Sequence, residues 1–335
     1  MNPYISLPIT ALLVYRSHTH SSLTPLGILF AALTALIHAL HPWPLPFTLL
    51  CTFFLTGTFV TKIHHGEKSR LTLSASGSSG GGGDIGGRTH IQVLANSGAA
   101  SLLILLHLYL YKGRSWLYND KEEVKVGLRC WAYGAADVIP VGIVANYAAV
   151  AADTFASELG ILSKSAPRLV TSLRLRKVPP GTNGGVTMMG LGAGFLGSGI
   201  IAVVSGVLMP FCREGKTGFE GGYAWGLKER VAFVVGVTVW GGLGSVLDSF
   251  LGGWMQASVI DKKSGKVVEG RGGKKVIVYS EAQGKGKSGS RKVESGLDLL
   301  DNNGVNFLMA GIMSLTAMSL TAWVWSLPPD NIFVL

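Results

Sequence analysis

Charged residues are scarce in this chain. Only 14% of the 335 residues are Asp, Glu, Lys or Arg, whereas a soluble domain carries about a quarter. Hydrophobic residues make up 48% and the mean hydropathy is +0.39. Long apolar runs recur, several of them near the length that crosses a bilayer. The composition therefore excludes an ordinary soluble domain and predicts an integral membrane protein.

Several motifs are also missing, and each absence removes support for a class of chemistry. The sequence contains no H-E-x-x-H and no G-x-S-x-G, so metalloprotease and esterase activities have no support. The Gly-Lys-Thr at 215–217 and the Gly-Lys-Ser at 286–288 lack the earlier glycine of a Walker A loop. The N-terminus shows no convincing signal or transit peptide. The three cysteines, Cys51, Cys130 and Cys212, lie far apart, and we expect neither a metal site nor a disulfide framework from them.

The basic residues fall between the apolar runs and give a formal net charge of +10. Such residues set topology and attract anionic headgroups, and some of them could bind a phosphorylated substrate. No basic helix with interleaved aromatic residues is present, so nucleic acid is not an expected partner. Because nearly every loop is basic, the sequence alone does not fix the orientation.

The apolar runs predict an all-α polytopic bundle of six or seven spans, in which some helices are broken or half-length. A piece at 5–15 is too short to span. Pro140 is expected to break the longest run, as is tolerated where a helix lines a cavity. The expected spans are 23–40, 46–61, 91–111, the 126–162 run, 186–211, 231–260 and 303–327.

Polar segments divide the chain. Residues 1–61 form an N-terminal hairpin with its flanking segment, and 62–90 a basic, Gly/Ser-rich flexible loop. A catalytic transmembrane domain follows at 91–327 and includes the polar loop 261–301, where 274–280 reads as one strand of a small hairpin. Residues 328–335 form a tail.

Two acidic residues lie within apolar runs. Asp153 shares a helix face with Asn146, Ala149, Ser157 and other small residues, because positions three and four apart are neighbours. Asp248 shares its face with Gly241, Gly244 and Ser245. An ionised Asp in a membrane costs about 2.5–3.5 kcal/mol and marks a functional site by default. We expect the two stripes to face one another across a cavity, where the carboxylates bind Mg²⁺. The alternative is an Asp at a helix end, solvated or paired with Arg.

A Gly-rich loop follows the first acidic helix. Lys177 leads into Gly181, Thr182, Asn183, Gly184, Gly185 and Thr187, and the next helix begins nearby. Consecutive backbone N–H groups and a helix N-terminus favour an anion, and Arg168 adds charge. The loop is either a phosphate site or a flexible turn with ordinary interfacial cations. Farther on, Asn302, Asn303 and Asn306 follow Asp301 at a helix start, where they cap the helix or contact metal or phosphate.

The motifs ADTFASELG, KVPPGTNGGVT, LDSFLGG and LDNNGVN occur in this order. Together they resemble the polytopic membrane family that includes phytyl-phosphate kinase of plants and cyanobacteria and eukaryotic transmembrane protein nineteen. The resemblance runs from about residue 62 to the last span. It carries over to Asp153, Ser157, Glu158, Arg168, Lys177, Gly181–Gly185, Thr187, Asp248, Asn302, Asn303 and Asn306. Gln92 and Asn96 match a further motif, from which the extra Ser97 departs.

The resemblance implies an enzyme that transfers a phosphoryl group from CTP or another nucleoside triphosphate to a prenyl monophosphate, with Mg²⁺ as cofactor. Asp153, Glu158, Asp248 and Lys177 are then the catalytic candidates, and Asp153 and Asp248 the metal ligands. The partners implied are the prenyl lipid, the nucleotide and membrane lipids, and a homo-oligomer is compatible with the sequence. The expected location is the endoplasmic reticulum or another endomembrane. An ion-coupled transporter and a non-catalytic scaffold are the alternatives.

Overall fold

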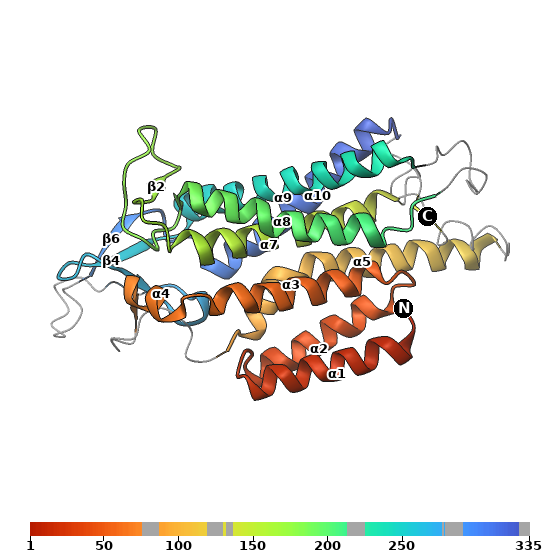
Figure 1. Cartoon of the computed structure of the whole chain (residues 1–335), viewed down its shortest axis with the longest axis horizontal. Coiled ribbons are helices and arrows are strands. Elements are labelled where there is room, and N and C mark those ends of the chain that lie inside the picture. Colours follow the sequence, from red (N-terminus) through yellow and green to blue (C-terminus); the bar gives the residue numbers. More distant parts are fainter. Residues whose placement is uncertain are drawn as a thin grey trace.

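The structure, a computed structural model, describes residues 1–75, 87–118, 130–131, 137–212, 225–276, 278 and 291–327. Its long helices run side by side in one bundle (Figure 1). Six of them are long and apolar enough to cross a membrane, which confirms the predicted polytopic all-α bundle. These are α3 (Leu45–Lys62), α5 (His90–Tyr118), α7 (Val138–Gly160), α8 (Met188–Leu208), α9 (Leu227–Met255) and α10 (Asn302–Val324).

Two shorter helices precede the spans. Helix α1 (Pro3–Thr19) is longer than the apolar piece expected there. Helix α2 (Pro25–Leu40) begins at Thr24, whose side chain accepts a hydrogen bond from the Gly27 amide, and has only 16 residues. The run 23–40 is therefore shorter than a full span. Both helices lie along one side of the bundle, where α2 packs against α3 and α5 and α1 packs against α2 (Figure 1).

Helix α7 is the centre of the bundle. It packs against α3, α5, α8, α9 and α10, and 83% of its span is buried inside the protein. Pro140 does not break it, contrary to the prediction. The proline occupies the first turn of α7, where a missing N–H removes no intrahelical hydrogen bond. Residues 126–129 and 132–136 of the 126–162 run lie outside the described residues.

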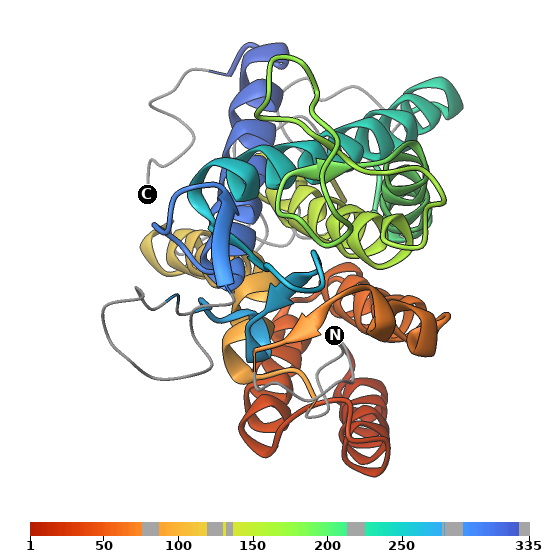
Figure 2. The ribbon, with the colours of Figure 1, turned by 90° about the vertical axis from the view of Figure 1, so that its left-hand side faces the viewer.

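One end of the bundle carries a small mixed sheet (Figure 2). Its strands are β1 (Leu73–Ser74), β4 (Ser258–Asp261), β5 (Val267–Glu269) and β6 (Arg291–Ser295), in the order β1-β5-β4-β6. Strand β1 pairs parallel to β5, and the other neighbours are antiparallel. The strand expected at 274–280 is not formed at 274–276, and 277, 279 and 280 lie outside the described residues. The polar loop pairs through other segments.

The 62–90 segment has more structure than the expected flexible loop. It contains α4 (His65–Leu71) and strand β1. Arg88 then forms a bridge with Leu23 ahead of α5. The Ser/Gly-rich part, 76–86, lies outside the described residues.

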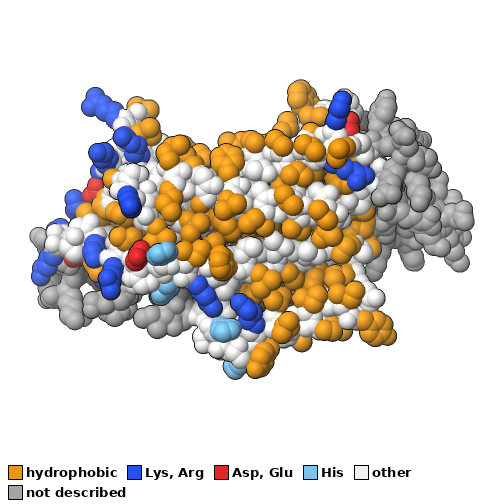
Figure 3. Space-filling model, in the orientation of Figure 1, with side chains coloured by type: hydrophobic (Ala, Val, Ile, Leu, Met, Phe, Trp, Pro, Cys, Tyr) orange, Lys and Arg blue, Asp and Glu red, His pale blue; other side chains and the backbone are white. Residues whose placement is uncertain are grey.

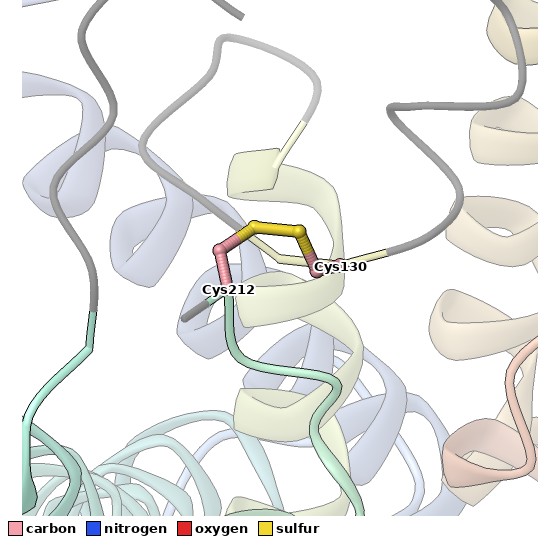
Figure 4. The surroundings of a disulfide bond; sticks show 2 residues. All are labelled: Cys130 and Cys212. Carbon is pink, nitrogen blue, oxygen red and sulfur yellow. A yellow bond between two sulfur atoms is a disulfide. The ribbon is translucent and has the colours of Figure 1, made fainter. Parts of the chain in front are cut away.

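The opposite end of the bundle holds a disulfide between Cys130 and Cys212, with the Cα atoms 4.9 Å apart (Figure 4). The expectation of no disulfide was wrong. Their separation of 82 residues gives no pairing signal, but the segments before α7 and after α8 run parallel here, and the Cys212 amide donates to the Trp131 carbonyl at 3.0 Å. Trp131, Phe211, Trp225 and Phe233 pack their rings against one another beside the bridge.

The surface has two parts, an apolar belt along the helices and a basic end. Hydrophobic side chains cover the length of the helices, as expected for contact with lipid, while Lys and Arg gather at the end that carries the sheet (Figure 3). Exposed apolar side chains such as Leu102, Val207 and Leu315 belong to the belt. One end of the bundle is therefore strongly basic.

Candidate functional site

The two intramembrane acids meet. The side chains of Asp153 on α7 and Asp248 on α9 lie close enough to interact directly. Asp248 Oδ1 is buried and has no hydrogen-bond partner. Two carboxylates this close repel each other unless they share a proton or a cation. The prediction that the two acidic stripes face one another is therefore confirmed by the geometry.

Glycine allows the two helices to approach so closely. A Cβ added at Gly244 would lie 2.6 Å from the Cβ of Ala149, and one at Gly241 would lie 2.7 Å from the Ala148 carbonyl. Real Cβ contacts this short essentially do not occur, so only glycine fits at these two positions. The helices touch directly instead of enclosing the expected cavity. The acids consequently lie at a tight helix–helix contact near the basic end.

Two buried amide oxygens on the helices that carry or pack against the acids also lack partners. Asn306 Oδ1 on α10 and Asn146 Oδ1 on α7 are both buried without a hydrogen-bond partner. The Asn146 amide nitrogen donates to the Asn96 carbonyl of α5 at 2.9 Å. Buried oxygens usually find a donor or a cation, and hard oxygen ligands suit Mg²⁺.

These residues fit a magnesium ion that is also held by a substrate. Among the described residues, no cluster of three His, Cys, Asp or Glu side chains could form an all-protein metal site. Mg²⁺ commonly uses one or two carboxylates and completes its shell with water and phosphate oxygens. Asp153 and Asp248 match that pattern.

Glu158 lies five residues beyond Asp153, near the end of α7, and its carboxylate already has hydrogen-bond partners. It accepts hydrogen bonds from Lys68 Nζ at 2.6 Å and Thr61 Oγ1 at 3.1 Å. Lys68 also donates to the carbonyls of Val60 and Thr61, at 3.0 and 2.9 Å, and thereby caps α3. Arg88 donates to Thr61 Oγ1 at 3.0 Å. Glu158 therefore ties α7 to α3 and to the 62–90 segment.

A second buried acid, Glu269 of β5, lies beyond this cluster. Burial raises the pKa of Glu269 to about 7, the neighbouring Thr72 hydroxyl acts in the opposite direction, and the negative charge of Glu158 raises it further. Burial also lowers the pKa of Arg88, against the attraction of Glu158. The cluster is thus a set of desolvated charges at the membrane edge.

The Gly-rich loop is held mainly by the protein itself. The amides of Thr182, Asn183 and Gly185 donate to Pro179 O, Ser258 Oγ and Thr182 O. Gly181 and Gly184 have φ of +84° and +78°, which favours glycine. A Cβ on Gly184 would also lie 2.6 Å from Gly253 Cα. At least these three N–H groups are therefore not free for a phosphate.

Thr187 and Gly160 lie where the end of α7 meets the start of α8. Thr187 is the N-cap of α8, where its hydroxyl accepts from the Gly190 amide at 3.0 Å. The same hydroxyl donates to the Gly160 carbonyl at the end of α7. A Cβ on Gly160 would lie 2.9 Å from Gly190 Cα. The end of α7 and the start of α8 are thus packed backbone to backbone.

The cations predicted to bind phosphate lie on the outside of the loop. Arg168 donates to the Leu175 carbonyl of its own loop at 3.3 Å, and Lys177 is exposed. Arg176 pairs with Glu294 at 2.6 Å, and Arg176 and Lys292 hold the pKa of Glu294 below its ordinary value. No described ion pair joins these cations to Asp153 or Asp248. The structure separates the basic loop from the acidic pair.

The other predicted residues occupy local roles. Ser157 donates to the Asp153 carbonyl of its own helix at 2.9 Å. Gln92 Oε1 accepts from the Thr89 amide at 2.8 Å at the start of α5. Asn303 is buried and donates to the Gly272 carbonyl at 2.9 Å, and Asn302 lies beside Gly273. The expected helix cap is supplied by Asp301, which accepts from the Gly304 amide.

Sequence reasoning missed Lys68, Arg88, Thr61 and Glu269. Lys68 and Arg88 lie in the 62–90 segment, which we interpreted as a flexible basic loop. A signal was available, because a cation immediately outside a span is well placed to cap its last carbonyls. Their common partner, Glu158, comes from the far side of the bundle and cannot be read from local spacing.

Comparison with known proteins places the chain in a family. Residues 8–314 match the family described as integral membrane protein DUF92. The chain is similar to "Protein PGR" of Arabidopsis thaliana, with 31% identity over 305 residues, covering 90% of this chain and 89% of that protein. It is also similar to "Uncharacterized membrane protein MJ0933" of Methanocaldococcus jannaschii, with 38% identity over 91 residues, 27% of this chain and 37% of that one. No solved structure matches. The chain belongs to the DUF92 family of integral membrane proteins, which confirms the family predicted from the motifs.

Proposed function

We propose that this protein is a membrane phosphotransferase that moves a phosphoryl group from CTP or another nucleoside triphosphate to a prenyl monophosphate. The observation that carries the proposal is the contact between Asp153 and Asp248, inside the bundle and next to its basic end. The motifs that resemble phytyl-phosphate kinase run through both acidic helices.

The transfer is chemically simple. A monophosphate oxygen forms a bond to the γ-phosphorus of the nucleotide while the bond to the bridging oxygen breaks. The products are the prenyl diphosphate and a nucleoside diphosphate. Because the monophosphate approaches the triphosphate of the nucleotide, four phosphate groups meet, and catalysis requires mainly positioning and neutralisation of negative charge.

The chain's residues divide this work. Asp153 and Asp248 would hold Mg²⁺, and the unpartnered oxygen of Asn306 lies on α10, which packs against both of their helices. The ion, when bound, neutralises phosphate charge. Lys68 and Thr61 position Glu158 at the end of α7, which in turn fixes the helix that carries Asp153. The exposed cations Arg168 and Lys177 raise the local concentration of the anionic nucleotide.

An ion-coupled carrier is the alternative function. The argument for it was the expectation of broken helices together with intramembrane acids. The described part of α7 passes Pro140 as a continuous helix, which removes the observation that favoured it there. The intramembrane acids alone suit either class.

A phosphorylation assay on purified protein in detergent tests the proposal. It uses labelled CTP, ATP, GTP and UTP with Mg²⁺ and a panel of prenyl monophosphates. We expect wild type to form diphosphate, and Asp153→Asn and Asp248→Asn to lose turnover by at least a hundredfold while remaining folded. The matched control is Asp298→Asn, which removes an exposed carboxylate at the same end. Folded wild type that forms no product with any pair would refute the proposal.

A further inference from the structure

An apolar pocket lies between helices α1, α2, α3 and α5. Small residues of α2, Ala31, Ala32 and Ala35, make room for it. Its other walls consist mostly of large aliphatic and aromatic side chains, with a few small polar ones between them; the apolar ones include Leu13, Ile28, Leu50, Phe53, Phe54 and Val93. The lining would suit a hydrocarbon chain and offers few partners to a sugar or a base.

One end of the pocket is polar. Arg88, Gln92 and Asn96 line it there. The Arg88 guanidinium nitrogens lie 3.6 and 3.7 Å from the point where a Cβ on Gly57 would stand, and Thr154 of α7 reaches the same point at 3.7 Å. Thr154 follows Asp153 directly in the chain. The polar end of the pocket therefore adjoins the acidic helix.

The shape and charge of this pocket indicate an amphiphile with one anionic group. We propose that it holds the isoprenoid tail of the monophosphate substrate, with the phosphate at Arg88. This inference rests on the proposed function. Guanidinium binds phosphate in a bidentate manner, and within the described part of the chain the Arg88 guanidinium donates a single hydrogen bond, to Thr61 Oγ1. The occupant would enter between α1, α2 and α5 from the lipid.

A photoreactive lipid locates the site directly. The probe is geranylgeranyl monophosphate with a diazirine in its tail, added to the purified full-length protein and mapped by mass spectrometry. We expect crosslinks in α1, α2 or the first turns of α5. Crosslinks confined to α8, α9 or α10 would overturn the pocket.

Variants in α2 test the same pocket. Ala32→Trp fills it, and we expect at least a tenfold loss of crosslinking. Leu36→Trp is the control on the same helix, because Leu36 is 43% exposed on the outer face, and it should crosslink like wild type. Equal crosslinking of both folded variants would contradict the proposal. Should Ala32→Trp not fold, the wild-type crosslink positions decide alone.

Substitution of the cation tests the headgroup. We expect Arg88→Gln to lose the preference for prenyl monophosphate over the uncharged prenyl alcohol, measured by competition against the crosslinker. An unchanged preference would remove Arg88 from the site. Crosslinking in the pocket without phosphoryl transfer from any nucleotide would refute the proposed function but support the lipid site. Phosphoryl transfer with crosslinks outside the pocket would support the proposed function and refute the lipid site.

A second inference concerns which way the bundle lies in its membrane. Basic residues outside the spans concentrate at the end with the sheet, whereas the described residues of the opposite end include only four cations, Lys112, Arg114, Lys228 and Arg230. The described cations of the sheet end include Lys62, Lys68, Arg70, Arg88, Lys164, Arg168, Arg174, Arg176, Lys177, Lys262, Lys263, Lys266, Lys274, Lys275, Arg291 and Lys292.

The disulfide points to the same orientation independently. Loops rich in Lys and Arg stay on the cytosolic side, and disulfides persist in oxidising compartments. The Cys130–Cys212 bridge lies at the end away from the cations. We infer that the sheet end faces the cytosol and the disulfide end faces a lumenal or extracellular space. The nucleotide would then come from the cytosol.

Thiol labelling distinguishes the two orientations. In a Cys51→Ser parent, single cysteines are placed at Leu173, which is fully exposed in the basic loop, and at Lys228. Sealed vesicles with the cytosolic face outward are treated with a membrane-impermeant maleimide. We expect Leu173→Cys to react at once and Lys228→Cys only after permeabilisation. The opposite order would overturn the inference.

Discussion

Lys68 and Glu158 offer a sharp test of how the basic end is built. The Lys68 side chain is 7% exposed and that of Glu158 27%. Lys68→Met removes the 2.6 Å ion pair and two hydrogen bonds to the carbonyls at the end of α3. It leaves Glu158 partly buried with no cation paired to it. Breaking a buried pair from one side costs about 3–5 kcal/mol, so we expect a loss of that size.

The reciprocal change should cost less. Glu158→Gln leaves Lys68 its two carbonyl acceptors and a neutral amide, so the loss is about 1–3 kcal/mol. Residues in one network are not additive. The double variant Lys68→Met/Glu158→Gln should therefore be about 1–3 kcal/mol more stable than the sum of the single changes predicts.

Reversible unfolding in mixed detergent micelles gives the three free energies. Turnover of the same variants separates the roles of Glu158, since a positioning residue should allow the double variant to keep activity that Asp153→Asn abolishes. Single losses below about 1 kcal/mol, or additive effects within about 0.5 kcal/mol, would refute the network. An inactive but stable double variant would instead assign Glu158 to the reaction.

Three further predictions follow from other parts of the structure. Gly244→Ala should lower the free energy of unfolding by about 1–3 kcal/mol through overpacking against Ala149. A Cβ at Gly236 on the same helix meets nothing within 4 Å, so Gly236→Ala should raise that free energy by about 0.5–1 kcal/mol. Equal effects of the two changes on unfolding in detergent would contradict the close contact. Because burial raises the pKa of Glu269 from 4.5 to about 7, the folded state binds the proton more tightly, so stability should fall as pH rises through that interval; Glu269→Gln should flatten this slope in thermal melts at pH 4.5–7.5. Cys212→Ser should lose about 2–4 kcal/mol, since the bridge closes a loop of 82 residues; a reductant should reproduce the loss in wild type and leave the variant unchanged.

The sequence predicted the membrane bundle and the acidic pair because both depend on local patterns. Apolar runs define spans, and the 3.6-residue period placed Asp153 and Asp248 on small-residue faces that fit each other. Pro140 was misjudged because its effect depends on where the helix begins. The position that starts α7 is set by packing at Trp131, whose indole donates to the Asp137 carbonyl.

Long-range pairing was beyond local patterns. Cys130 finds Cys212, and Lys68 finds Glu158 across 90 residues, only because the topology brings the segments together. The Gly-rich loop shows a further limit. Its composition suits a phosphate, but the same glycines also suit a turn whose amides bind Ser258 and Pro179. Composition indicates which backbone conformations a loop can adopt. Whether its amides are free or already hydrogen-bonded depends on neighbouring segments such as β4, whose Ser258 accepts from Asn183.

The central position of α7 has a consequence for how the protein is made. This helix carries Asn146 and Asp153 and is surrounded by five other spans, so little of it is left to meet lipid. A span with an intramembrane acid is unfavourable alone in a bilayer, yet α7 leaves the ribosome before α8, α9 and α10. During synthesis it therefore depends on α3 and α5, and the Asn146 hydrogen bond to α5 is available to retain it until the later helices arrive. Variants that weaken this contact should lower membrane insertion and protein abundance before they affect the assembled protein.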